Sequence, residues 1–101
     1  MCSIFGIFNL QSGEESQHLR REALERSGRL RHRGPDWSGV YLDAGAILVH
    51  ERLAIVDPAG GSQPLLSDDG QLALAVNGEI YNHRALKTEL TQPYAFQTES
   101  D

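Results

Sequence analysis

Met1-Cys2-Ser3-Ile4-Phe5-Gly6 begins this chain of 101 residues, and the stretch contains the only cysteine in the sequence, Cys2. If Met1 is removed, as is usual when a small residue follows, Cys2 has both a thiol and a free α-amine, with ordinary pKa values of about 8.5 and about 7.7–8.0. The amine could then activate the thiol, so that one residue supplies a nucleophile and its base. Residues 3–8 predict a buried strand, which would hold this terminus rigid.

A second interpretation of Cys2 is open at this point. A free cysteine is more often a small buried apolar residue than a catalyst. Residues at chain ends are also commonly poorly ordered. The choice between the catalytic and the inert cysteine depends on the other motifs of the chain.

Length and composition predict a single globular domain. The chain is 40% hydrophobic and 23% charged, as is common for such proteins. A net charge of −5 argues against binding to nucleic acid, because phosphate groups attract positive charge. One cysteine excludes an internal disulfide and suits a reducing compartment. No apolar run is long enough to span a membrane and no signal-peptide pattern is present, so we predict a cytoplasmic protein.

Spacing and turn residues predict both helices and strands. Residues 14–30 are predicted to form a helix, because apolar and small residues recur there at helical spacing: Leu19, Ala23, Leu24, Ser27 and Leu30. Two hairpins are expected, with strands at 40–42 and 46–49 and at 65–66 and 72–76. A short helix over about 83–90 should turn Ala85, Leu86 and Leu90 inward, and residues 94–98 alternate like a strand. The predicted fold class is α+β.

The sequence predicts no metal or nucleotide site. The four histidines, His18, His32, His50 and His83, lack the spacing of metal ligands, and only one cysteine could join them. Gly60-Gly61 lacks the spacing and the lysine of a phosphate-binding loop. Because the chain stops after the strand predicted at 94–98, we expect it to be the front of a longer protein.

The chain contains four separated motifs: MCSIFG at 1–6, RHRGPD at 31–36, HERLAIVD at 50–57 and NGEIYN at 77–82. Any one of them alone would be a weak signal, but their order and spacing make the set specific. Together they resemble the N-terminal glutaminase domain of glutamine-hydrolysing asparagine synthetases, which are class II glutamine amidotransferases. Glucosamine-6-phosphate synthase and amidophosphoribosyltransferase, two other class II enzymes, share the early cysteine and the Asn-Gly pair. They lack the combination of HRGPD, here at 32–36, with NGEIYN, here at 77–82, so the asparagine synthetase branch is preferred. A glutaminase domain of another class II amidotransferase is the alternative. No role is assigned to the loop from His32 to Asp36.

The resemblance implies catalytic roles for three residues. Cys2 would attack the side-chain amide of glutamine, giving a γ-glutamyl thioester and ammonia. The Asn77 side-chain amide and the Gly78 backbone N–H would face the oxyanion that this attack creates.

The resemblance also implies how glutamine is held. Arg52 would pair with the α-carboxylate, for which the planar guanidinium is well shaped. Asp101, helped by Glu79, would take the α-ammonium group. The remaining pocket residues would be Leu53, Ala54, Ile55 and Val56, partly through backbone groups.

The implied fold is that of the N-terminal-nucleophile hydrolases, with layered antiparallel sheets flanked by helices, of which residues 1–101 would be the truncated N-terminal part. The rest of that domain and a synthetase domain, which would use ATP and magnesium to convert aspartate to asparagine, would lie outside these residues. We expect no cofactor in residues 1–101. The expected partners are L-glutamine, the downstream synthetase domain and, in the full-length parent, a second copy of the chain. Residues 1–101 alone are expected to be inactive, and a non-catalytic module with the same residues is the competing hypothesis.

Overall fold

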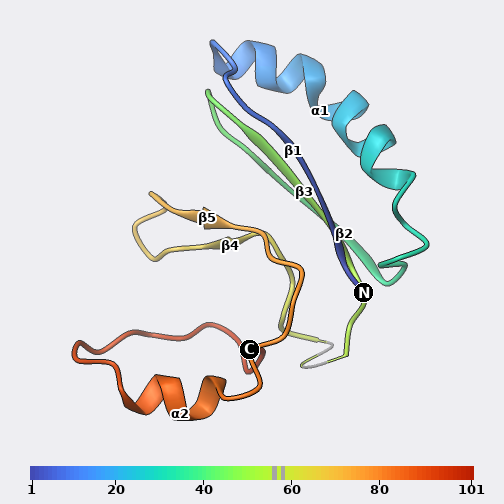
Figure 1. The fold of residues 1–101 in the computed structure, drawn as a ribbon. Helices are drawn as coiled ribbons and strands as arrows, with labels where there is room; N and C mark the ends of the chain where they lie inside the picture. The colour runs from blue at the N-terminus through green and yellow to red at the C-terminus, as the bar shows by residue number, and fades with distance from the viewer. Residues whose placement is uncertain (56, 58) are drawn as a thin grey trace.

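The computed structural model describes residues 1–55, 57 and 59–101. The elements run in the order β1 (Ser3–Ile7), α1 (Gly13–Gly28), β2 (Trp37–Leu42), β3 (Ile47–Arg52), β4 (Leu65–Leu66), β5 (Ala73–Leu74) and α2 (His83–Thr88). Figure 1 shows α1 lying along one face of the sheet formed by β1, β2 and β3, with the β4–β5 hairpin and α2 on the other side of that sheet. Helices combined with antiparallel strands confirm the predicted α+β class.

The larger sheet has the strand order β1-β3-β2 and is antiparallel throughout. The turn between β2 and β3 is closed by the Asp43 carboxylate, which accepts hydrogen bonds from the N–H groups of Gly45 at 2.7 Å and Ala46 at 2.8 Å. The first predicted hairpin is therefore confirmed, although both strands extend further than expected. Since β3 is the central strand, residues 47–51 pair with strands on both sides, while Arg52 pairs only with Trp37 of β2.

Helix α1 covers one face of this sheet and completes the core. Ser12 caps its start, because the Ser12 hydroxyl accepts a hydrogen bond from the Glu15 N–H at 3.1 Å. The predicted helix is confirmed, but it ends at Gly28 because the following residues form tight turns with bonds to carbonyls three positions earlier. The fully buried core residues are Ala23, Ile47 and Val49.

The prediction that the first strand is buried is correct for only one of its faces. Ser3 is buried, whereas Ile4, which points the other way, is 39% exposed. The reason is that α1 packs against a single face of the sheet, and successive side chains of a strand point to opposite faces.

The C-terminal half agrees less well with the sequence-based expectations. Strands β4 and β5 confirm the second hairpin, in a shorter form. The predicted inward face of α2 is wrong: Ala85 is exposed, and the side chains of Leu86 and Leu90 are 43% and 51% exposed. These two leucines border a hollow of about 210 Å³ that no described side chain fills.

The strand expected over residues 94–98 is also wrong, since these residues form no strand. A strand needs a partner for its ladder of hydrogen bonds, and among the described residues none pairs with this segment. Instead, the rings of Tyr94 and Phe96 pack edge to face with their centroids 5.1 Å apart, and the Lys87 ammonium lies 4.5 Å from the Phe96 ring centroid.

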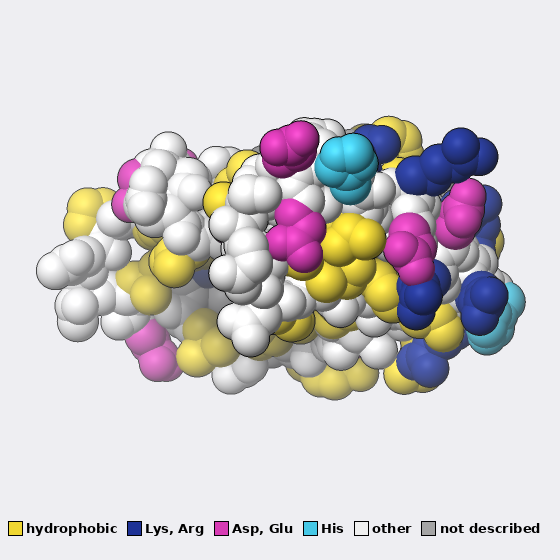
Figure 2. Space-filling model, turned by 90° about the horizontal axis from the view of Figure 1, so that it is seen from above, with side chains coloured by type: hydrophobic (Ala, Val, Ile, Leu, Met, Phe, Trp, Pro, Cys, Tyr) yellow, Lys and Arg dark blue, Asp and Glu magenta, His cyan; other side chains and the backbone are white. Residues whose placement is uncertain are grey.

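The outer face of α1 is charged. Ion pairs one helical turn apart join Arg21 to Glu25 at 3.2 Å and Arg26 to Glu22 at 2.6 Å. Figure 2 looks down on the molecule from above Figure 1, and basic and acidic side chains are intermixed toward one end of this face. Neither helix in the described part of the chain combines the length and apolar character that crossing a membrane requires.

Candidate active site

Cys2 lies directly before β1, so the pairing of β1 with β3 determines its surroundings. Ser3 pairs with Glu51, which brings Cys2 to the end of β3. The Leu53 N–H donates a hydrogen bond to the Cys2 Sγ at 3.3 Å, and the Sγ lies 3.7 Å from the Leu53 carbonyl oxygen. Cys2 is half-buried. The first and third sequence motifs therefore meet at the thiol.

Arg52, the last residue of β3, is almost fully buried, with 5% of its surface exposed. Its Nη2 donates to the Asp57 carbonyl oxygen at 2.7 Å. A Cβ on Gly61 would lie 2.4 Å from this Nη2 and 3.1 Å from the Ser100 Cβ, so glycine at position 61 permits the close approach. The guanidinium thus lies among the end of β3, the turn that follows it and Ser100.

The motif from Arg31 to Asp36 packs against the end of β3. The Asp36 N–H donates to the Arg52 carbonyl oxygen at 2.9 Å, and the Asp36 carboxylate accepts a hydrogen bond from the Ala54 N–H at 2.8 Å. At Gly34 an added Cβ would lie 2.1 Å from the Glu51 carbonyl oxygen, so only glycine fits there. This motif, to which the sequence assigned no role, supports the backbone beside Cys2.

A cavity of about 480 Å³ lies between the β4–β5 hairpin and the C-terminal segment. Gly78, Glu79 and Asp101 line its polar part together with Gly61 and Ser100, while residues of the hairpin and both aromatic rings of the C-terminal segment line the apolar part. The Asp101 carboxylate accepts a hydrogen bond from the Ile80 backbone N–H. That bond is the main cause that lowers the pKa of Asp101, so the side chain is ionised at neutral pH.

Three of the predicted site residues, Gly78, Glu79 and Asp101, therefore line one cavity, and the other described ones lie elsewhere. Cys2 and Arg52 do not line the 480 Å³ cavity. Asn77 is exposed and does not line it either. Within the residues that the structure describes, no hydrogen bond joins Cys2 to Asn77 or Gly78.

The predicted pocket residues that follow Arg52 differ in their distance from the thiol and in their exposure. Leu53 contacts the Cys2 thiol through its backbone, and Ala54 is tied to Asp36, as described above. Ile55 is 65% exposed and does not line the cavity. Val56 lies outside the described residues.

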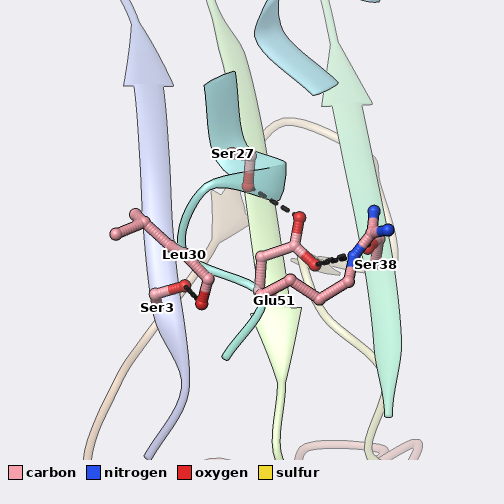
Figure 3. Close-up of polar contacts among 6 residues, drawn as sticks. Ser3, Ser27, Leu30, Ser38 and Glu51 are labelled. Carbon is pink, nitrogen blue, oxygen red and sulfur yellow. Dashed lines mark hydrogen bonds and ion pairs between the residues drawn. The ribbon is translucent and has the colours of Figure 1, made fainter. Parts of the chain in front are cut away.

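Glu51 is a buried residue that the sequence analysis did not single out. It is fully buried, and its carboxylate accepts hydrogen bonds from the hydroxyl of Ser27 at 2.9 Å and from that of Ser38. The Arg31 Nε lies 3.8 Å from the same carboxylate. Figure 3 shows Glu51 between the end of α1 and β2, with Ser3 on the neighbouring strand bonded to the Leu30 carbonyl. A serine within the buried face of the predicted helix was the only signal of this contact.

His50 and Gln63 were also missed as candidates for the site. His50 is fully buried, and its Nε2 lies 3.0 Å from the Val76 carbonyl oxygen. Burial lowers the pKa of His50 more than this contact raises it. The Gln63 side-chain oxygen accepts a hydrogen bond from the Val76 N–H at 2.7 Å. In the described part of the chain, His, Cys, Asp and Glu side chains form no group that could hold a metal ion.

Comparison with known proteins gives a consistent result. A family model described as a glutamine amidotransferase domain matches residues 1–101. The chain is 55% identical over 101 residues to asparagine synthetase B [glutamine-hydrolyzing] of Escherichia coli (strain K12), and 54% identical over 103 residues to a probable asparagine synthetase of Dictyostelium discoideum. A probable asparagine synthetase of Schizosaccharomyces pombe is 50% identical over 101 residues. Each match covers 100% of this chain but only 18% of the relative's length.

Proposed function

This chain belongs to the glutamine amidotransferase family, and we propose that it is the leading part of the glutaminase domain of a glutamine-hydrolysing asparagine synthetase. The observation that supports this most strongly is identity of 50–55% over the whole chain to proteins named as such synthetases. The alternative, another class II amidotransferase, shares only some of the four motifs. The N-terminal-nucleophile hydrolase fold is part of the proposal.

The proposed reaction begins at Cys2 after removal of Met1. The α-amine takes the thiol proton, and Sγ attacks the side-chain amide carbon of glutamine. When the tetrahedral intermediate collapses, the amide nitrogen leaves with that proton as ammonia, and a γ-glutamyl thioester remains for water to hydrolyse to glutamate. The Leu53 N–H bond to Sγ supports this role, because it holds the thiol in place.

Asn77 and Gly78 are proposed to stabilise the oxyanion. One such donor is typically worth about 2.7–4 kcal/mol of the barrier. Both residues are exposed and therefore accessible to a substrate, and Gly78 borders the cavity.

Arg52, Glu79 and Asp101 are proposed to hold the amino-acid end of glutamine. Asp101 has a lowered pKa and shares the cavity wall with Glu79, which suits an α-ammonium group. The Arg52 guanidinium lies near Ser100, next to Asp101 in sequence, which is consistent with binding of the α-carboxylate beside the ammonium site. Residues 53–56 would complete the pocket.

The ammonia would be used by a synthetase domain to form asparagine, in keeping with the names of the relatives. Aspartate as the acceptor and a requirement for ATP and magnesium are further parts of the proposal. We assign no ATP or magnesium ligand to residues 1–101. A cytoplasmic location and a homodimer of the full-length protein are parts of the same proposal.

Nitrogen transfer tests this proposal directly. The full-length gene product is supplied with aspartate, ATP, magnesium and glutamine labelled with ¹⁵N at the side-chain amide. We expect the label in the side-chain amide of asparagine. Labelled ammonia without labelled asparagine would indicate a glutaminase with another acceptor, and unconsumed glutamine would contradict the proposal.

A further inference from the structure

The backbone of Val76, immediately before Asn77, is held by side chains from two other parts of the chain. Strand β5 ends at Leu74, and Val76 takes part in no strand pairing among the residues that the structure describes. Instead, its N–H donates to the Gln63 side-chain oxygen at 2.7 Å, and its carbonyl oxygen lies 3.0 Å from the His50 Nε2. Two consecutive peptide units, 75–76 and 76–77, are thereby fixed.

The tautomer of the His50 ring follows from the contacts of its two nitrogens. The His50 Nδ1 is buried and has no hydrogen-bond partner in the described part of the chain. Since the Val76 carbonyl can only accept, Nε2 must bear the proton, and His50 is the neutral tautomer that donates to it. A donor fixed in the central strand β3 therefore sets the plane of the peptide that leads into Asn77.

Gly39 makes room for Gln63, whose side chain accepts the hydrogen bond from the Val76 N–H. Gly39 pairs with His50 across β2 and β3, and a Cβ at position 39 would lie 1.8 Å from the Gln63 carbonyl oxygen. The backbone of Gln63 therefore rests directly on the strand, beside His50. Gly39, His50 and Gln63 form one cluster, and within it His50 and Gln63 contact the Val76 backbone.

We propose that His50 and Gln63 are positioning residues for the oxyanion donors Asn77 and Gly78, with Gly39 providing the space that Gln63 needs. The inference rests on the proposed glutaminase function. Oxyanion donors act only at about 2.7–3.1 Å from the developing charge, so the peptide before them must be held closely. Neither His50 nor Gln63 is required to touch glutamine in this role.

The test uses the full-length gene product and pairs of variants at each position. Gln63→Leu and His50→Leu remove the two contacts with Val76, whereas Gln63→Glu keeps an acceptor and His50→Gln keeps a donor. We expect each leucine variant to lower kcat for glutamine hydrolysis about 10- to 100-fold with KM changed less than about twofold, because a misplaced catalytic group costs rate at this scale. The conservative variants should recover most of the rate.

A second measurement separates positioning from general damage. Alkylation of Cys2 by iodoacetamide needs an accessible thiol but no oxyanion donor, so its rate should stay the same in all four variants. Gly39→Ala should behave like Gln63→Leu, because the added methyl displaces Gln63.

Unchanged kcat in both leucine variants, or alkylation that falls in parallel with kcat, would overturn the positioning role. Glutamine hydrolysis that survives Cys2→Ala would instead overturn the proposed function, and the positioning role with it. The two failures are therefore distinguishable.

Discussion

The thiol of Cys2 is held by the backbone of a distant residue. The N–H of Leu53, 51 positions later in the chain, donates to Sγ, and this contact exists because β1 pairs with β3. The structure thus supports a fixed N-terminal cysteine over a frayed one. The proposed activation of the thiol requires, in addition, a free α-amine on Cys2.

We therefore predict that the active protein lacks Met1. The α-amine can act as a base only when Cys2 is the first residue. Intact-mass measurement of the purified, active full-length gene product checks this expectation. Fully active molecules that retain Met1 would exclude the proposed base.

Substitutions at Asn77 and Arg52 should affect different kinetic constants. Asn77→Ala removes a donor needed mainly in the transition state, so kcat for glutamine hydrolysis should fall by about 10²–10³ with a smaller effect on KM. Arg52→Ala removes the proposed contact to the unreactive end of glutamine, so KM should rise.

Arg52 also bonds to the Asp57 carbonyl oxygen. Denaturant unfolding of Arg52→Ala should therefore accompany its kinetics, to separate lost substrate binding from lost stability. A rise in KM for Asn77→Ala as large as that for Arg52→Ala would contradict the assigned roles.

At the scale of the elements, Glu51 joins the end of α1 to the sheet. Its carboxylate bonds to Ser27 of α1 and Ser38 of β2, and both contacts are needed because a buried charge without partners is costly. Glu51 directly precedes Arg52 and pairs with Ser3, the residue after Cys2. The same contact that packs the helix therefore also fixes the strand ends beside the thiol.

Glu51→Ala should destabilise the protein by about 3 kcal/mol, since it leaves the buried Ser27 hydroxyl and the half-buried Ser38 hydroxyl without this acceptor and opens a cavity. Chemical denaturation of the full-length gene product measures the change in the free energy of unfolding. Glu25→Ala is the matched control on the exposed face of α1, where the Glu25 side chain is 66% exposed, and should change stability by less than about 0.5 kcal/mol. Equal effects at the two positions would show that the buried contact contributes little.

The buried ring of His50 predicts a dependence of stability on pH. Its pKa lies below the ordinary value of 6.5 in the folded chain, mainly because of burial. The unfolded chain therefore binds a proton first, and the free energy of unfolding should fall as the pH drops below about 6.5 toward the folded pKa. His50→Gln should show a smaller fall than the wild type over this window in denaturant titrations. The same slope in both proteins would show that His50 is not its source.

At the scale of the whole molecule, the sequence predicts what is local. The hairpin closed by Asp43 and the helix capped by Ser12 follow from residues a few positions apart, and both are confirmed. The strand expected at 94–98 fails because strand formation depends on a partner that alternation alone does not reveal.

The candidate site shows the same limit. The motifs predict Cys2 and Arg52 as site residues, and the resemblance adds Asp101; the comparisons confirm membership of the family. Sequence reasoning missed Glu51 and His50, because their partners lie 24 and 26 positions away and become neighbours only in the folded sheet. Distant pairs of polar residues leave no periodic signal in a single sequence.

The nucleophilic role of Cys2 is the claim on which the other assignments depend, and one comparison of nitrogen sources tests it. Asparagine formation by the wild-type full-length gene product and by Cys2→Ala is measured with glutamine and, separately, with free ammonia. We predict that Cys2→Ala loses synthesis from glutamine and keeps synthesis from ammonia, because only the glutaminase step needs the thiol. Synthesis from glutamine that continues in Cys2→Ala would contradict the account.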